Sequence, residues 1–101
     1  MIIYNVTVSV LESISDEWLD WMKNVHIPEV MRTGLFIENR ILKLKLPETE
    51  EGVTYAIQYS MKSMDEYNKY QKEFAPALQK LHTDKYTNRV HAFRTVLEIV
   101  E

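Results

Sequence analysis

The feature that most constrains the fold is an alternation between two hydrophobic periods along a chain of 101 residues. Three segments carry apolar residues at every second position, the period of a β-strand, and they are residues 2–10, 53–61 and 92–100. After the first segment, Trp18, Met22 and Val25 recur at helical spacing. The sequence therefore predicts strands and helices that alternate within a single domain, residues 1–101.

A fourth strand is predicted over residues 35–46, where the alternation changes phase partway along the segment. Leu35 and Leu42 have opposite parity, so a β-bulge around residues 38–40 is expected. The polar residues 47–52 form a loop of hairpin length. The strand that follows this loop should therefore pair antiparallel with the strand before it.

A proline interrupts the first predicted helix. Ser13 or Ser15 is expected to cap its start through a side-chain oxygen. Pro28 blocks the turn that precedes it, so we expect a kink or a restart of the helix at this residue. Gly34 is expected to end the helix in the left-handed conformation.

The second predicted helix begins at a capping box that runs from Ser63 to Glu66. Pro76 interrupts this helix as Pro28 interrupts the first. Its predicted buried stripe consists of Tyr67, Tyr70, Phe74, Leu78 and Leu81. The second helix thus precedes the last strand, and the full order of elements is β-α-β-β-α-β.

This order predicts an α+β fold of the ferredoxin-like class, in which two helices cover one face of a four-stranded antiparallel sheet. The face toward the helices is predicted to carry Tyr4, Val6, Val8, Tyr55, Ile57, Tyr59, Phe93, Leu97 and Ile99. The opposite face is predicted to carry Ile3, Asn5, Thr7, Ala56, Gln58, Arg94, Val96 and Val100. A mixed face of this kind favours a homodimer interface over a solvated surface.

Composition excludes several kinds of partner. The net charge of −3, without a block of lysine or arginine, argues against binding to nucleic acid. The chain has no cysteine, which excludes a thiolate metal site and fits a reducing compartment. Residues 1–11 contain polar side chains and lack a basic leader, so they are not expected to be a signal peptide, and no apolar run is long enough to span a membrane. We therefore expect a cytoplasmic protein that has no membrane partner.

His26 is the first candidate for chemistry, because it lies beside the apolar stripe and just before Pro28. An imidazole at this position is suited to act as a general base or to orient a ligand at neutral pH. The alternative is a structural role, in which the half-buried ring of His26 forms a hydrogen bond with a backbone carbonyl that lacks a helical partner because of Pro28. The sequence leaves both roles open.

Five further residues complete the candidate site. Arg40 is expected to stabilise an anion that forms beside His26, and Glu29 is expected to pair with this arginine or with Arg94. The remaining candidates for ligand binding are Trp21, Tyr59 and His82. Their aromatic side chains suit a flat ligand, although the same residues also serve as core. His26 and Glu29 are close enough to share a helix face, but two ligands are fewer than a metal site usually needs, so no metal is expected.

The segment that carries a family resemblance is WLDWMKNVHIPEVMRTG at residues 18–34, together with Phe-Arg-Thr at residues 93–95. It resembles the dimeric α/β-barrel superfamily, which includes antibiotic-biosynthesis monooxygenases and EthD-like proteins. The most similar member is an uncharacterised domain-of-unknown-function family of about 100 residues. The resemblance implies two ferredoxin-like subunits that pack sheet to sheet, each with a pocket between its sheet and its helices.

The resemblance extends weakly to haem-degrading members of the superfamily, whose asparagine and histidine correspond to Asn5 and His82. Their tryptophan is replaced here by a tyrosine on the third strand. A haem site is therefore not expected, and no other cofactor is implied.

Together, these observations favour a small-molecule-binding homodimer. One expectation is a cofactor-independent oxygenase or isomerase that acts on an aromatic or enolic substrate. The alternative is a non-catalytic binding or interaction module whose own aromatic residues fill the interior, and a regulatory domain of the ACT type is a third candidate. Whether the protein is an enzyme stays open at this point. An open cavity that His26 lines would favour the first expectation.

Overall fold

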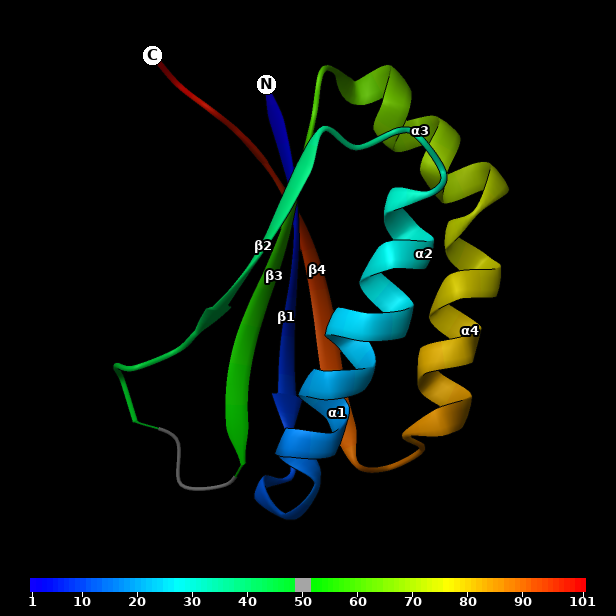
Figure 1. Ribbon diagram of the computed structural model, residues 1–101. Helices are drawn as coiled ribbons and strands as arrows, with labels where there is room; N and C mark the ends of the chain where they lie inside the picture. The colour runs from blue at the N-terminus through cyan, green and yellow to red at the C-terminus, as the bar shows by residue number, and fades with distance from the viewer. Residues whose placement is uncertain (49–51) are drawn as a thin grey trace.

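Four strands form one antiparallel sheet in the order β2-β3-β1-β4. Their bounds are β1 (Ile2–Val10), β2 (Glu38–Lys43), β3 (Val53–Met61) and β4 (Val90–Glu98). The computed structural model describes residues 1–48 and 52–101. Within these residues, all helices cover the same face of the sheet and none lies over the opposite face (Figure 1). The predicted ferredoxin-like fold is confirmed.

One helical segment follows β1 and a second follows β3, and both lie in one layer. The first comprises η1 (Glu12–Ile14), α1 (Ser15–Trp21), η2 (Met22–His26) and α2 (Ile27–Met31). The second comprises α3 (Met64–Glu73) and α4 (Ala75–Lys85). In Figure 1, α1 and α2 run on into each other against the sheet, and α4 lies beside them, before the chain returns to the sheet as β4. The helices therefore bring His26 and His82 into the same layer.

The first helix passes Pro28 without breaking, because it widens into a π-helical turn, η2. The amide of Ile27 donates to the carbonyl of Met22, five residues back. Pro28 has no amide hydrogen, and its ring would clash with the carbonyl of Asn24 in a regular helix. The wide turn avoids this clash, and π-helical turns are frequent at functional sites. Its last residue is the buried His26.

The expected serine cap of the first helix is wrong. Ser15 is the first residue of α1, and its hydroxyl donates to the carbonyl of Glu12 at 3.0 Å. The capping box of the second helix is confirmed, because the Ser63 hydroxyl accepts from the amide of Asp65 at 3.3 Å and contacts the Glu66 carboxylate. Gly34 has a φ of 77°, as expected for a left-handed stop after α2.

The predicted second helix is broken before Pro76, because Phe74 leaves the helical conformation between α3 and α4. The buried face of α4 therefore does not continue the buried face of α3. Tyr70 is buried as predicted, but Leu81 is 52% exposed. His82 is buried on α4 instead, and Tyr86 is buried directly after the helix ends. The prediction assumed one continuous helix, and such a pattern does not show that one helical segment is rotated relative to the next.

Strand β2 is shorter than the strand predicted over residues 35–46, and the bulge expected around residues 38–40 is wrong. The register with β3 is regular from Glu38, which pairs with Ser60, to Lys43, which pairs with Tyr55. The amide of Ile37, just before the strand, donates to the carbonyl of Ser60 at 2.7 Å, so the irregularity lies where the chain enters β2.

The register of β4 corrects the predicted faces. Val6 of β1 lies between Ile57 of β3 and Arg94 of β4, so these three side chains share one face. Val6 packs against the buried core beneath the helices, and Arg94 therefore points to the helical side rather than to the open side. Phe93 and Leu97 lie on the open face. The prediction failed because both parities of this strand contain apolar residues.

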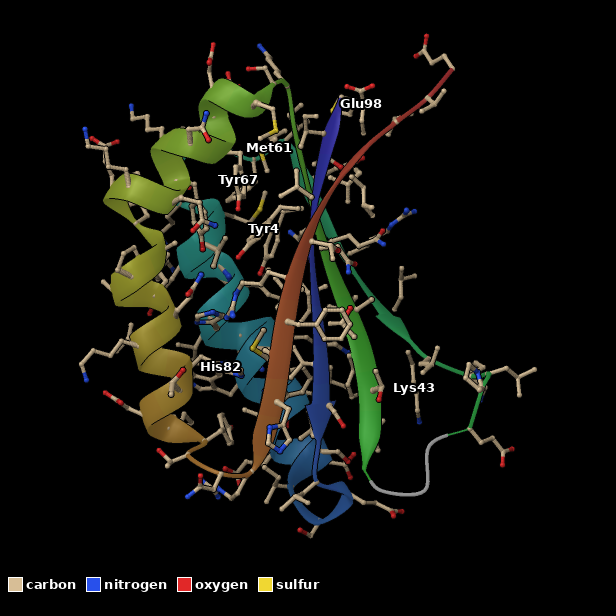
Figure 2. The ribbon with its side chains drawn as sticks, turned by 180° about the vertical axis from the view of Figure 1, so that it is seen from behind. Tyr4, Lys43, Met61, Tyr67, His82 and Glu98 are labelled. Atoms are coloured by element: carbon tan, nitrogen blue, oxygen red, sulfur yellow. The ribbon has the colours of Figure 1, made fainter. Side chains whose placement is uncertain are left out.

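An aromatic cluster fills the upper half of the layer between sheet and helices. Tyr4 contacts the rings of Phe36, Tyr59, Tyr67 and Tyr70, with centroids 5.6–6.3 Å apart. Figure 2 shows Tyr4 and Tyr67 in this layer, on the side of the sheet that the helices cover. These contacts anchor α3 on the sheet and bound the candidate site from above.

Candidate functional site

Two histidines face each other below the aromatic cluster. His26 comes from the end of η2 and His82 from α4, and their ring centroids lie 5.7 Å apart. Trp21 stacks on both rings, at 4.9 Å from His26 and 5.9 Å from His82. The indole Nε1 of Trp18 donates to His82 Nε2 at 2.9 Å. Figure 2 shows His82 between α4 and the sheet.

The hydrogen bonds of the two imidazoles differ. Because His82 Nε2 accepts from Trp18, a neutral His82 carries its proton on Nδ1. His26 is only 9% exposed, and its Nδ1 has no hydrogen-bond partner among the residues that the structure describes. A buried polar atom without a partner is costly, and such atoms are rare in folded proteins. His26 therefore has an unused hydrogen-bonding position in the interior.

His26 also lines a small cavity between the sheet and the helices. Its volume is about 30 Å³, which is about the space of one water molecule. Both histidines, Arg94 and the side chain of Gln79 line it, and so do Tyr4, Tyr59, Tyr70, Val6, Val8, Met22, Val30 and Ile57. No carboxylate belongs to this lining. The interior is thus well packed, and it retains one pocket with a cation and two imidazoles.

The pKa values show that both histidines are neutral at pH 7. Desolvation by burial, the neighbouring His82 and the positive charge of Arg94, in that order, lower the pKa of His26 to about 4. Desolvation and Arg94 lower the pKa of His82 to about 4 as well. An uncharged His26 is able to accept a proton or a hydrogen bond at neutral pH.

The tyrosine hydroxyl groups that line the cavity stay protonated and can donate hydrogen bonds. Burial, as the largest cause, raises the pKa of Tyr4, Tyr59 and Tyr70 above the ordinary value for tyrosine. The pKa of Tyr70 stays high although Arg94 acts to lower it. Neutral phenols can donate hydrogen bonds to an anion but bring no charge of their own. Arg94 is therefore the permanent charge in the lining of the cavity.

The structure brings together only part of the predicted site. His26, Tyr59 and His82 line the cavity, and Trp21 stacks against the two histidines without lining it. Glu29 lies elsewhere, in a groove between α2 and the region where α3 meets α4. Its predicted place beside His26 is wrong, because the helical face that carries it turns away from the sheet.

Arg40, the predicted partner of His26, is on the other side of the sheet. It pairs with Gln58 of β3, whose side chain points to the open face, and its Nε donates to Gln58 Oε1 at 2.8 Å. The sheet therefore separates Arg40 from the imidazole of His26. Its expected role, stabilisation of an anion beside His26, is not available to it.

A line of polar side chains crosses the open face from Arg40. Gln58 Nε2 donates to Asn5 Oδ1 at 3.3 Å, and Asn5 Nδ2 donates to Thr95 Oγ1 at 3.3 Å. Asn5 and His82 consequently lie on opposite sides of the sheet. The pair that resembles the haem-degrading enzymes does not assemble in this chain.

The sequence predicts Arg94 on the open face of the sheet, but the structure places it on the helical side, where it is the charged residue of the site. Trp18 and Gln79 were also missed as neighbours of the histidines. The motif Phe-Arg-Thr at residues 93–95 drew attention to Arg94, but its strand offers no internal sign of which parity faces inward. Only the pairing of β4 with β1 reveals the orientation.

Among the described residues, no group of three histidine, cysteine, aspartate or glutamate side chains is placed to hold a metal ion. None of the helices in this part of the chain is long and apolar enough to cross a membrane. The site consists of one arginine, two neutral imidazoles, and phenolic, amide and apolar side chains.

A family model described as a domain of unknown function (DUF4286) matches residues 1–100, so the chain belongs to this family. This confirms the expectation of an uncharacterised family of the same length. No curated protein sequence matches the chain.

Solved structures of the wider group share the fold. A dimeric ferredoxin-like protein from an uncultured marine organism is similar with a TM-score of 0.70 at 8% identity, covering 99% of this chain and 95% of that one. An EthD family protein from Bacillus halodurans has a TM-score of 0.68 at 8% identity, covering 99% and 100%. SnoaB, a cofactor-independent oxygenase from Streptomyces nogalater, has a TM-score of 0.69 at 10% identity, covering 99% and 94%. At these identities, the similarity shows the fold alone.

Proposed function

We propose that this protein is a homodimer that binds a small molecule with an acidic hydroxyl group, an enol or a phenol, next to His26. The observation that carries the proposal is the unpartnered Nδ1 of the buried His26 at a cavity that Arg94 also lines. The ligand hydroxyl donates to this nitrogen, and Arg94 stabilises the negative charge that develops on the oxygen as the proton moves.

Proton abstraction of this kind is the first step of a cofactor-independent oxygenase or an isomerase. A neutral imidazole is present at pH 7 because the pKa of His26 is about 4. A similar fold in SnoaB, a cofactor-independent oxygenase, supports this reaction class. General base catalysis contributes about 10²–10⁴ in rate.

A second function, a non-catalytic binding or interaction module, is favoured by one specific observation. The cavity of about 30 Å³ admits a hydroxyl group but not an aromatic ring. If nothing binds there, the buried rings around Tyr4 act as core only. The two functions differ in whether a ligand reaches His26.

Replacement of His26 by phenylalanine is expected to abolish the response to a hydroxyl ligand. Phenylalanine can keep the stacking on Trp21 but has no nitrogen. We expect the wild-type His26 ring signals to shift in NMR titrations with phenol and with acetylacetone, and the affinity of the variant to fall at least about tenfold. The control is Lys23→Phe, at an exposed position of η2 that lines neither of the pockets next to His82 and Arg94. Equal affinities for the His26 variant and the wild type would refute the role of His26.

The homodimer is proposed on the composition of the open face of the sheet. Exposed apolar side chains gather there around the polar line from Arg40 to Thr95, and they are Leu42, Leu44, Phe93 and Leu97. Exposed apolar clusters of this type mark protein interfaces. The similar ferredoxin-like protein from a marine organism is dimeric, which supports the same assembly here.

A glutamate in place of Phe93 is expected to dissociate the dimer. Phe93 is 62% exposed on the open face, so the variant should fold normally but leave a charge in the interface. Sedimentation should show the wild type as a dimer at micromolar concentration and Phe93→Glu as a monomer, with a dissociation constant at least about tenfold higher. Leu81→Glu on α4 is the control and should remain dimeric. A wild type that sediments as a monomer of 12.0 kDa would contradict the proposal.

A further inference from the structure

A second pocket lies on the surface between the end of α4, the following turn and the start of β4. Its volume is about 290 Å³. His82 and Arg94 line this outer pocket, and the same two residues line the inner cavity beside His26. They therefore form a common wall between the surface and the interior. In Figures 1 and 2 the chain passes from the end of α4 through a short turn into β4 at this end of the molecule.

The side chains that line the two pockets carry no negative charge. Neither lining contains an aspartate or a glutamate, and both contain Arg94. No ion pair joins Arg94 to a carboxylate within residues 1–48 and 52–101. The net charge of the chain is −3, but Arg94 lies at the junction of the two pockets without an acidic partner in the described part of the chain. The local charge there is therefore positive.

Arg94 also combines two properties that a ligand-binding cation needs. Its side chain is exposed, so a ligand can reach it from solvent, and it lies near enough to the histidines to lower the pKa of both. A guanidinium group binds a planar carboxylate through two parallel hydrogen bonds. The neutral side chains of Thr83 and Asn88 add polar groups to the outer pocket.

We propose that the ligand is a small hydroxy- or enol-carboxylate that enters between α4 and β4, with its carboxylate on Arg94 and its hydroxyl in the inner cavity at His26. This assignment rests on the proposed function and names the chemical class of its ligand. The body of the ligand lies in the outer pocket, whose volume is close to the lower limit of about 300 Å³ for ligand pockets. One aromatic ring or a short acyclic chain fits this space.

A pair of probes of equal shape tests the charge. 2-Hydroxybenzoate and 2-hydroxybenzamide both present a phenolic hydroxyl beside a planar group, but only the first is an anion. Wild-type protein is expected to bind the acid at least about tenfold more tightly than the amide, with shifts of the His26 and His82 ring signals. Arg94→Gln should abolish this preference, so that the acid and the amide bind the variant with equal affinity.

Two more variants control the experiment. Arg94→Lys keeps the charge without the planar fork, so it should recover part of the affinity for the acid. Arg32→Gln removes a positive charge at the end of α2, away from both pockets, and should behave like the wild type. The comparison of the acid with the amide uses the wild-type protein, so it remains informative even if a variant fails to fold.

The outcomes separate this inference from the proposed function. Equal affinities for acid and amide, with shifts at His26 and no effect of Arg94→Gln, would overturn the carboxylate assignment and leave the hydroxyl site standing. Preference for the acid without any change at His26 would place the ligand in the outer pocket alone, which contradicts the two-pocket arrangement. If neither probe binds at millimolar concentration, both proposals fail.

Discussion

Replacement of Ile57 by alanine is expected to lower the free energy of unfolding by about 2–5 kcal/mol. Ile57 is 1% exposed at the centre of the sheet, where it pairs with Val6 of β1 and Ile41 of β2 and borders the inner cavity. Truncation removes buried methyl groups and leaves a void that the sheet cannot close. Thermal denaturation should show a midpoint lower by about 10 °C or more.

The matched control is Leu81→Ala on α4. Leu81 belongs to the stripe that the sequence predicts as buried, but it is 52% exposed. Its truncation should change the free energy of unfolding by less than about 0.5 kcal/mol. A large loss at Leu81 together with a small one at Ile57 would mean that α4 is rotated relative to the arrangement described here.

Acidification from pH 7 to pH 4 is expected to destabilise the fold through His26 and His82. Each has a folded-state pKa of about 4, below the value of 6.5 for an exposed histidine. Between these values the unfolded chain binds more protons, so stability is fully present above pH 6.5 and is lost as the pH falls toward 4. Protonation of His82 also disrupts the hydrogen bond from Trp18.

The expected loss at pH 4 is on the order of 3 kcal/mol for each histidine, because one pKa unit corresponds to about 1.4 kcal/mol. Urea denaturation at a series of pH values measures it. The double variant His26→Phe with His82→Gln should show a flatter pH profile between 6.5 and 4. The variant His91→Gln serves as the control for loss of a histidine from the surface. Identical profiles for the wild type and the double variant would exclude these histidines as the cause.

The two neutral histidines have consequences for any chemistry at the site. Stacking on Trp21 and the hydrogen bond from Trp18 hold both rings in place. Rigid support of this kind prepares a base for a ligand without a change of backbone conformation. The π-helical turn that positions His26 exists because Pro28 follows two residues later. The same local sequence therefore produces the irregular turn and the unusual histidine.

The sequence by itself determined the order of elements, because the strand and helix periods are local and each segment carries its own pattern. It also determined the positions of several irregularities. Pro28, Gly34 and the capping box at Ser63 act on the backbone within a few residues, so their effects do not depend on the rest of the fold. His26 was found as a candidate for this reason.

Tertiary structure alone decided which residues meet His26. Arg40 and Arg94 both lie on strands, and an error of one position in parity moves a side chain to the other face of the sheet. The pairing of Arg94 with Val6 places it beside the histidines, while the pairing of Arg40 with Gln58 places it on the open face. Apolar residues occupy both parities of β4, so only hydrogen bonding to β1, nearly ninety residues away in the chain, selects the face that each side chain occupies.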